Sequence, residues 1–150
     1  MAAPPFKKLL VLVDGTESGL KAAEYAVRLA ASMPVHLTAL SVVDTDTLRK
    51  LMSARILVEQ EVAEFEKDLE QSQSRHLDFA RQLADKAGVT MTATLSKGVC
   101  HSAVLAEQKA HQADVIIIGG FRSTVTRMDL VARERQLILD EAPCPVLVVK

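Results

Sequence analysis

Three turns of the sequence hold the acids and glycines that could bind a phosphate or take part in catalysis. Each lies at the end of a short aliphatic run: residues 14–18, 41–44 and 119–122. In an open α/β sheet, ligands bind outside the carboxyl ends of the strands, so a binding site is expected where these turns meet.

No pattern of residues predicts a catalytic or metal centre. His36, His101 and His111 lack metal-ligand spacing, and the HExxH pattern is absent. Cys100 and His101 are adjacent, but neighbours on a helix point about a third of a turn apart and do not form a nucleophile–base pair. A small α/β enzyme that uses Cys100 or Asp14 is therefore the weaker hypothesis, since no triad or Walker lysine accompanies them.

Four arginines lie close together near the end of the chain: Arg122, Arg127, Arg133 and Arg135. One interpretation is an anion site, in which guanidinium groups replace glycine amides as phosphate ligands. The other is a set of surface ion pairs with local acids such as Asp129 and Glu134, each worth about 0–1 kcal/mol. We favour the ion pairs, because charge alone does not restore the geometry of a phosphate cradle.

The elements that position these turns alternate between strands and helices. Short, β-branched aliphatic runs are typical of strands covered on both faces, and they occupy residues 9–13, 35–43, 89–95, 115–118 and 146–149. Apolar residues at helical spacing predict helices between them, over residues 20–30, 62–87, 103–110 and 130–139. This alternation predicts an open α/β sheet of parallel strands, in a single domain over residues 1–150.

Composition and charge exclude several classes of function. The chain has 18 Lys and Arg residues and 19 Asp and Glu residues. Its charges therefore produce no overall positive electrostatic field that would hold nucleic acid or an anionic membrane. Aromatic residues make up only 3% of the chain, too few to stack single-stranded bases. The apolar runs are too short to span a membrane, and no signal-peptide pattern precedes them, which predicts a cytoplasmic protein.

The two cysteines, Cys100 and Cys144, form no CxxC pair and are expected to be reduced thiols. Cys144 lies between two prolines beside a predicted strand, which favours a packed and slowly reacting thiol. Cys100 is expected to begin a helix, where the dipole lowers the pKa of a thiol. We therefore expect Cys100 to react faster than Cys144.

Several segments together resemble the universal stress protein family: LVLVDGTESGLKAAEYAVRLA, SVVD, KGVCHSAVL and ADVIIIGG followed by APCPVLVVK. The resemblance runs nearly end to end, in the family's order and spacing. It implies a Rossmann-like, five-stranded parallel sheet of order 3-2-1-4-5 with two helices on each face. It also implies a small cytoplasmic protein, commonly dimeric, that is used under stress or growth arrest.

ATP-binding members of this family carry a phosphate loop of the form Gly-x-x-Gly, nine residues, Gly-Ser/Thr. Gly119 matches the first glycine of that loop. Arg122 and Ala132 stand at the other two glycine positions, and Arg133 stands at the hydroxyl position. The chain thus resembles a subgroup of the family with a degraded ATP-binding loop.

The adenosine half of the family's site is better matched. Asp14 corresponds to the acid on the ribose or adenine side, and Val42 to the position whose backbone meets adenine. Asp14 also has a structural alternative, in which its carboxylate closes the turn onto backbone N–H groups of residues 16–18.

These observations predict a non-enzymatic stress-response homodimer that acts by binding an unidentified protein partner, with no tight ATP site, cofactor or metal. The alternative is a member that binds ATP with Mg²⁺, or AMP, and turns ATP over weakly or not at all. Its binding residues would be Asp14, Val42, Gly119, Arg122 and Arg133. The last strand, Val146–Val149, is apolar on both faces and is expected at the sheet edge, where a second copy would cover it.

Overall fold

The chain folds around one parallel β-sheet with the strand order β3-β2-β1-β4-β5. The computed structural model describes residues 5–121 and 130–150. Its strands are β1 (Lys8–Leu12), β2 (His36–Val43), β3 (Met91–Lys97), β4 (Val115–Gly119) and β5 (Val146–Val149). The predicted fold class and strand order are therefore confirmed.

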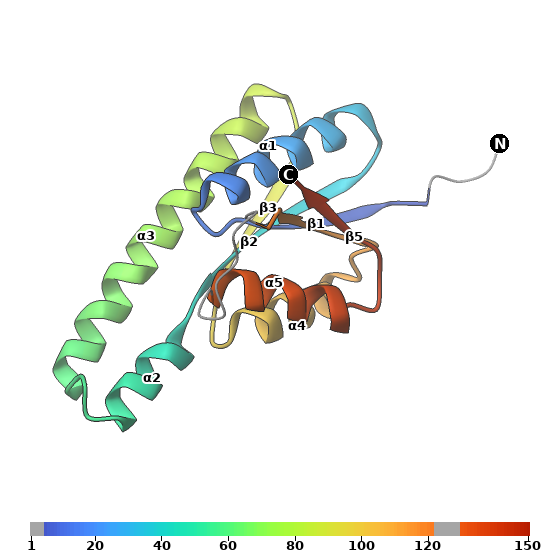
Figure 1. The fold of residues 1–150 in the computed structure, drawn as a ribbon. Helices are drawn as coiled ribbons and strands as arrows, with labels where there is room; N and C mark the ends of the chain where they lie inside the picture. The colour runs from blue at the N-terminus through green and yellow to red at the C-terminus, as the bar shows by residue number, and fades with distance from the viewer. Residues whose placement is uncertain (1–4, 122–129) are drawn as a thin grey trace.

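Helices cover both faces of the sheet, as predicted. They are α1 (Glu17–Ser32), α2 (Thr45–Ser53), α3 (Glu59–Lys86), α4 (Cys100–His111) and α5 (Leu130–Glu141). Figure 1 shows α1 and α3 on one side of the sheet and α4 and α5 on the other. In the described part of the chain, no helix is both long enough and apolar enough to cross a membrane.

The short helix α2 was not predicted from the sequence. It begins because the Asp44 carboxylate accepts hydrogen bonds from the Thr47 backbone N–H at 3.0 Å and from the Thr47 hydroxyl at 2.7 Å. Asp44, which the sequence placed in a turn at the carboxyl end of a strand, is thus the N-cap of α2. Its apolar residues, Leu48, Leu51 and Met52, follow helical spacing, but the helix has only nine residues and only Leu48 is buried.

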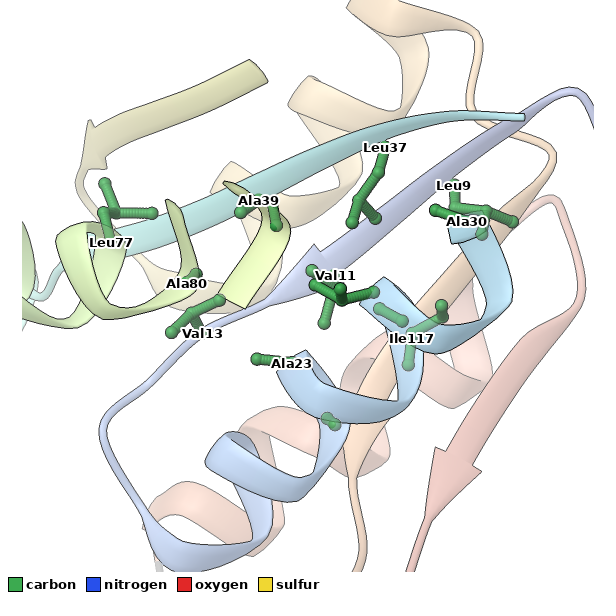
Figure 2. Packing of buried hydrophobic residues seen from close by; sticks show 14 of the residues in the cluster. Leu9, Val11, Val13, Ala23, Ala30, Leu37, Ala39, Leu77, Ala80 and Ile117 are labelled. Atoms are coloured by element: carbon green, nitrogen blue, oxygen red, sulfur yellow. The ribbon is translucent and has the colours of Figure 1, made fainter. Parts of the chain in front are cut away.

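The core consists of two aliphatic layers that share the central strands. On β1, Leu9 and Val11 belong to the layer under α1 and α3, whereas Leu10 and Leu12 belong to the layer over α4 and α5. Figure 2 shows the first layer, in which small alanines of α1 let that helix lie close to the sheet. Burial on both faces explains why the strands read as unbroken apolar runs.

The turn after β1 is held in place by a glycine and a helix cap. Gly15 has a φ of +77°, which disfavours other residues, and any Cβ there would contact the ring of His76 from α3. Thr16 then caps α1, its hydroxyl oxygen accepting a hydrogen bond from the Gly19 N–H at 2.9 Å. Because β4 pairs in parallel with β1, the turn that follows β4 lies at the same edge of the sheet.

Candidate functional site

A buried arginine occupies the sheet edge where β1 and β4 end. Arg135 lies on α5 and is only 4% exposed. Its Nη2 donates hydrogen bonds to Asp14 Oδ2 at 2.8 Å and to Thr16 Oγ1 at 3.0 Å. Its Nη1 donates to the Gly120 carbonyl oxygen at 2.6 Å. One guanidinium therefore joins α5 to the turns after both central strands.

Asp14 has both of its carboxylate oxygens engaged within the chain. Oδ1 accepts hydrogen bonds from the Thr16 backbone N–H at 3.1 Å and from the Thr16 hydroxyl at 2.6 Å. Oδ2 faces Arg135 in an ion pair whose two side chains are 20% and 5% exposed. The turn-closing role that the sequence suggested for Asp14 is present at Thr16, and the ion pair is added to it.

Gly119 has a structural role that does not involve a ligand. A Cβ at this position would lie 2.8 Å from Arg135 Nη2 and 2.7 Å from the carbonyl carbon of Ser18. Real side chains essentially never approach so closely, so the glycine admits both the guanidinium and the first turn of α1. The one glycine that matches the phosphate motif is therefore also required for internal packing.

The residue before Arg135 closes the start of the neighbouring helix. The Glu134 Oε2 accepts a hydrogen bond from the His101 backbone N–H at 2.8 Å and lies 2.6 Å from His101 Nδ1. Val99, the N-cap residue of α4, has no polar side chain to serve this purpose. Glu134 thus supplies the negative group that the N-terminus of α4 favours.

The pKa of Cys100 is shifted in the direction opposite to the expected one. Burial is the main cause that raises the pKa of the Cys100 thiol to about 12, and the charge on Glu134 is the next. The prediction of an activated thiol at Cys100 was wrong, because burial, with the added charge of Glu134, outweighs the effect of the helix N-terminus. Burial also raises the pKa of Cys144, as expected for a packed thiol.

The remaining predicted site residues differ in burial. Val42 is buried in β2, where it pairs with Ser96 of β3. Arg133 is exposed on α5 and forms no ion pair with any described residue. Arg122, Arg127 and Asp129 lie outside the residues that the structure describes. Across residues 5–121 and 130–150, no cluster of His, Cys, Asp and Glu could hold a metal ion.

In the sequence, Arg135 is one of four clustered arginines, and no separate role was predicted for it. The pattern that could have indicated a buried arginine is the spacing of the buried face of α5, where Ala132, Arg135 and Ile138 recur every three residues. A charged residue in register with an apolar face needs a buried partner. Asp14 could not be identified as that partner without the strand pairing, because the two lie 121 residues apart.

The sequence matches the profile of the universal stress protein family over residues 5–150. The chain belongs to this family. It is 25% identical to the universal stress protein MJ0531 of Methanocaldococcus jannaschii, over 97% of this chain and 82% of that protein. It is 23% identical to the universal stress protein YxiE of Bacillus subtilis, over 97% of this chain and 99% of that protein.

Solved structures of the family share the fold. A universal stress family protein from Burkholderia pseudomallei superposes with a TM-score of 0.77 at 20% identity, covering 99% of this chain and 98% of that one. A universal stress protein in complex with cAMP gives 0.69 at 17% identity, covering 97% of each chain. An Arabidopsis thaliana family protein with AMP bound gives 0.67 at 15% identity, covering 96% and 91%.

The first prediction concerns the buried ion pair. Asp14→Asn leaves the Arg135 guanidinium buried without its counter-charge, and we expect the free energy of unfolding to fall by about 3 kcal/mol. Urea unfolding followed by circular dichroism measures this loss. The control is Glu17→Gln, which removes an exposed partner 3.9 Å from Lys21 and should cost less than about 0.5 kcal/mol. Equal losses in the two variants would contradict the role of the pair.

The second prediction concerns thiol reactivity. Glu134→Gln removes a negative charge beside Cys100 and should lower the pKa of that thiol, so alkylation at alkaline pH should become severalfold faster. Mass spectrometry of partially labelled protein measures the rate, and Cys144 in the same sample serves as the internal reference. Glu141→Gln, an exposed change at the far end of α5, is the matched control. An unchanged rate at Cys100 in the Glu134 variant would refute the assignment.

Proposed function

We propose that this universal stress protein is a non-enzymatic, cytoplasmic homodimer that acts by binding a protein partner and holds no tight ATP site. The observation that supports this most directly is the Arg135–Asp14 ion pair at the strand-end site. The acid that corresponds to the nucleoside side of the family's site is occupied by the chain's own guanidinium.

The phosphate half of the site supports the same proposal. Ala132 is 8% exposed and buried on α5, so its Cβ is part of the packed face rather than an open cradle. Arg133 brings a long side chain to the position of the motif's hydroxyl. A degraded phosphate loop and an engaged acid together remove the two features that would hold a nucleotide tightly.

Nucleotide binding through a divergent loop is the second candidate function. It is favoured by the fold shared with the cAMP complex and with the AMP-bound Arabidopsis protein. Arg133 is exposed and could meet a phosphate. Arg122 carries a second guanidinium at a glycine position of the motif. For a nucleoside to reach Asp14, however, the Arg135 ion pair would have to open.

The proposed dimer interface is the edge strand β5. This strand pairs with β4 on one side and has no strand neighbour on the other among the described residues. Its side chains alternate between the two core layers, Leu147 and Val149 toward one, Val146 and Val148 toward the other, and all four are half-buried. A two-fold copy of the same strand would cover an apolar edge that otherwise invites aggregation.

We expect Val148→Lys to shift the protein from dimer to monomer at low micromolar concentration, because the exposed part of this half-buried side chain lies at the proposed interface, where a charge would become buried. Light scattering coupled to size exclusion measures the mass. Leu95→Lys places the same charge on β3, the opposite edge strand, and should leave the mass unchanged. A monomeric unmutated protein at micromolar concentration would rule out the dimer.

We expect ATP with Mg²⁺ to raise the melting temperature by less than about 1 °C. A competent site with an affinity of about 10 μM would add about 2.7 kcal/mol at about 1 mM ATP. For a domain of this size, that corresponds to roughly 5–10 °C. A clear rise in the unmutated protein would overturn the proposal and favour the nucleotide-binding alternative.

Restoring the motif sharpens this experiment. Arg122→Gly, Ala132→Gly and Arg133→Ser together rebuild the family's phosphate loop, and adding Arg135→Ala frees Asp14. We expect the ATP-dependent shift to be larger with all four changes than with the first three. Arg135→Ala alone is the control for the loss of the ion pair, and it should show no gain in the ATP-dependent shift.

A further inference from the structure

The hairpin formed by α2 and α3 projects beyond the sheet. Figure 1 shows α2 and the N-terminal part of α3 extending away from the α4–α5 pair, at the lower left of the view. The buried residues of α3 are Leu77, Ala80 and Ala84, all in its C-terminal part. The N-terminal part of this 28-residue helix therefore contributes no fully buried side chain to either core layer.

The tip of this hairpin exposes large apolar side chains. Ile56 is 65% exposed, Val58 61%, Phe65 48% and Met52 39%. Single exposed apolar residues are ordinary, but a group at one projecting end is typical of an interaction site. Nothing in the hairpin's own packing covers them.

Exposed charges of opposite sign accompany these apolar residues on the two helices. On α3, Val58, Glu61, Phe65 and Asp68 recur at spacings of three and four and share one face, which we call the acidic stripe. On α2 and the turn that follows it, Arg49, Met52, Arg55 and Ile56 form what we call the basic stripe. The arginines of the basic stripe and the acids of the acidic stripe form no ion pair with any described residue.

The helix dipoles explain only part of this arrangement. Arg55 follows the C-terminus of α2 and Glu61 lies in the first turn of α3, where such charges are favourable within one chain. Arg49 lies in the middle of α2, and Asp68 lies in the third turn of α3, beyond the reach of this effect. Because these two charges lie beside exposed apolar side chains, we expect them to contact a complementary surface of another molecule.

We propose that the α2–α3 hairpin binds the hairpin of a second copy of this chain in a two-fold arrangement. The basic stripe of one copy meets the acidic stripe of the other, and the symmetry repeats the contact. The complement of each stripe is a set of apolar residues with charges of the opposite sign, and the other stripe of the same chain provides it. This favours a second copy over a partner of a different kind.

This interface goes beyond the proposed function and does not depend on it. The hairpin adjoins β2 and β3, whereas β5 is the opposite edge of the sheet. A copy bound at the hairpin therefore leaves the β5 edge open. Both contacts together would assemble dimers into a larger complex.

Charge exchange between the stripes tests the proposal. The experiment uses the full chain carrying Val148→Lys, so that association at β5 is disabled, and measures sedimentation velocity from micromolar to submillimolar concentration. Arg49→Glu reverses one of the two charges of the basic stripe, and Asp68→Lys reverses one of the two charges of the acidic stripe. We expect each variant alone to associate about tenfold more weakly than the parent. An equimolar mixture should regain the parent's affinity, because each variant then meets its complement, and this recovery also shows that both are folded.

A pair of phenylalanine variants tests the apolar part of the interface. Phe65→Ser should weaken association about tenfold, by removing a central apolar contact. Phe79→Ser is the matched control, since Phe79 is similarly exposed on the C-terminal part of α3, outside the stripes. Equal effects of the two changes would overturn the proposal.

The other outcomes separate this proposal from the β5 dimer. A Val148→Lys protein that stays monomeric at every concentration overturns the hairpin interface and assigns the patch to a different partner. A mixture of the charge variants that does not recover also overturns it. If Val148→Lys leaves association unchanged while Phe65→Ser abolishes it, the β5 dimer fails and the hairpin interface stands.

Discussion

The buried ion pair between Arg135 and Asp14 is the constraint on which the carboxyl edge of the sheet depends. Removing both charges from water costs several kcal/mol per ion, so the pair persists only because hydrogen bonds satisfy most of its polar atoms. Thr16 and the Gly120 carbonyl supply those bonds, and Gly119 supplies the space. Arg135 Nε alone has no partner among the described residues.

Two adjacent residues of opposite charge set the position of α5. Arg135 reaches the turns after β1 and β4, while Glu134 reaches the N-terminus of α4. Each side chain satisfies groups that the partner element cannot satisfy for itself: a partly buried carboxylate in one case and free helix N–H groups in the other. The first turns of α5 are therefore joined to both layers of the molecule, directly beside the site at which the family's phosphate loop ends.

The strands and their order could be predicted because burial on both faces leaves unbroken aliphatic runs such as Ile116–Ile118 in β4. Helix α2 was missed because its apolar positions, Leu48, Leu51 and Met52, span little more than one turn. The site was less predictable still. Asp14 and Cys100 stood out in the sequence, but their state depends on Arg135 and Glu134, which only the packing of α5 brings to them.

The match of a motif position therefore does not by itself indicate the ligand of that motif. Gly119 fits the phosphate loop, yet the same missing Cβ is needed to admit Arg135 and the backbone of Ser18. Asp14 fits the nucleoside acid, yet both its oxygens accept hydrogen bonds from the chain itself. In this protein an arginine side chain of the same chain engages the acid and occupies the space beside the glycine. Because these residues are engaged within the chain, function at exposed surfaces is favoured. The apolar β5 edge and the α2–α3 hairpin, which carries charges of both signs, are the surfaces whose exposure core packing does not explain.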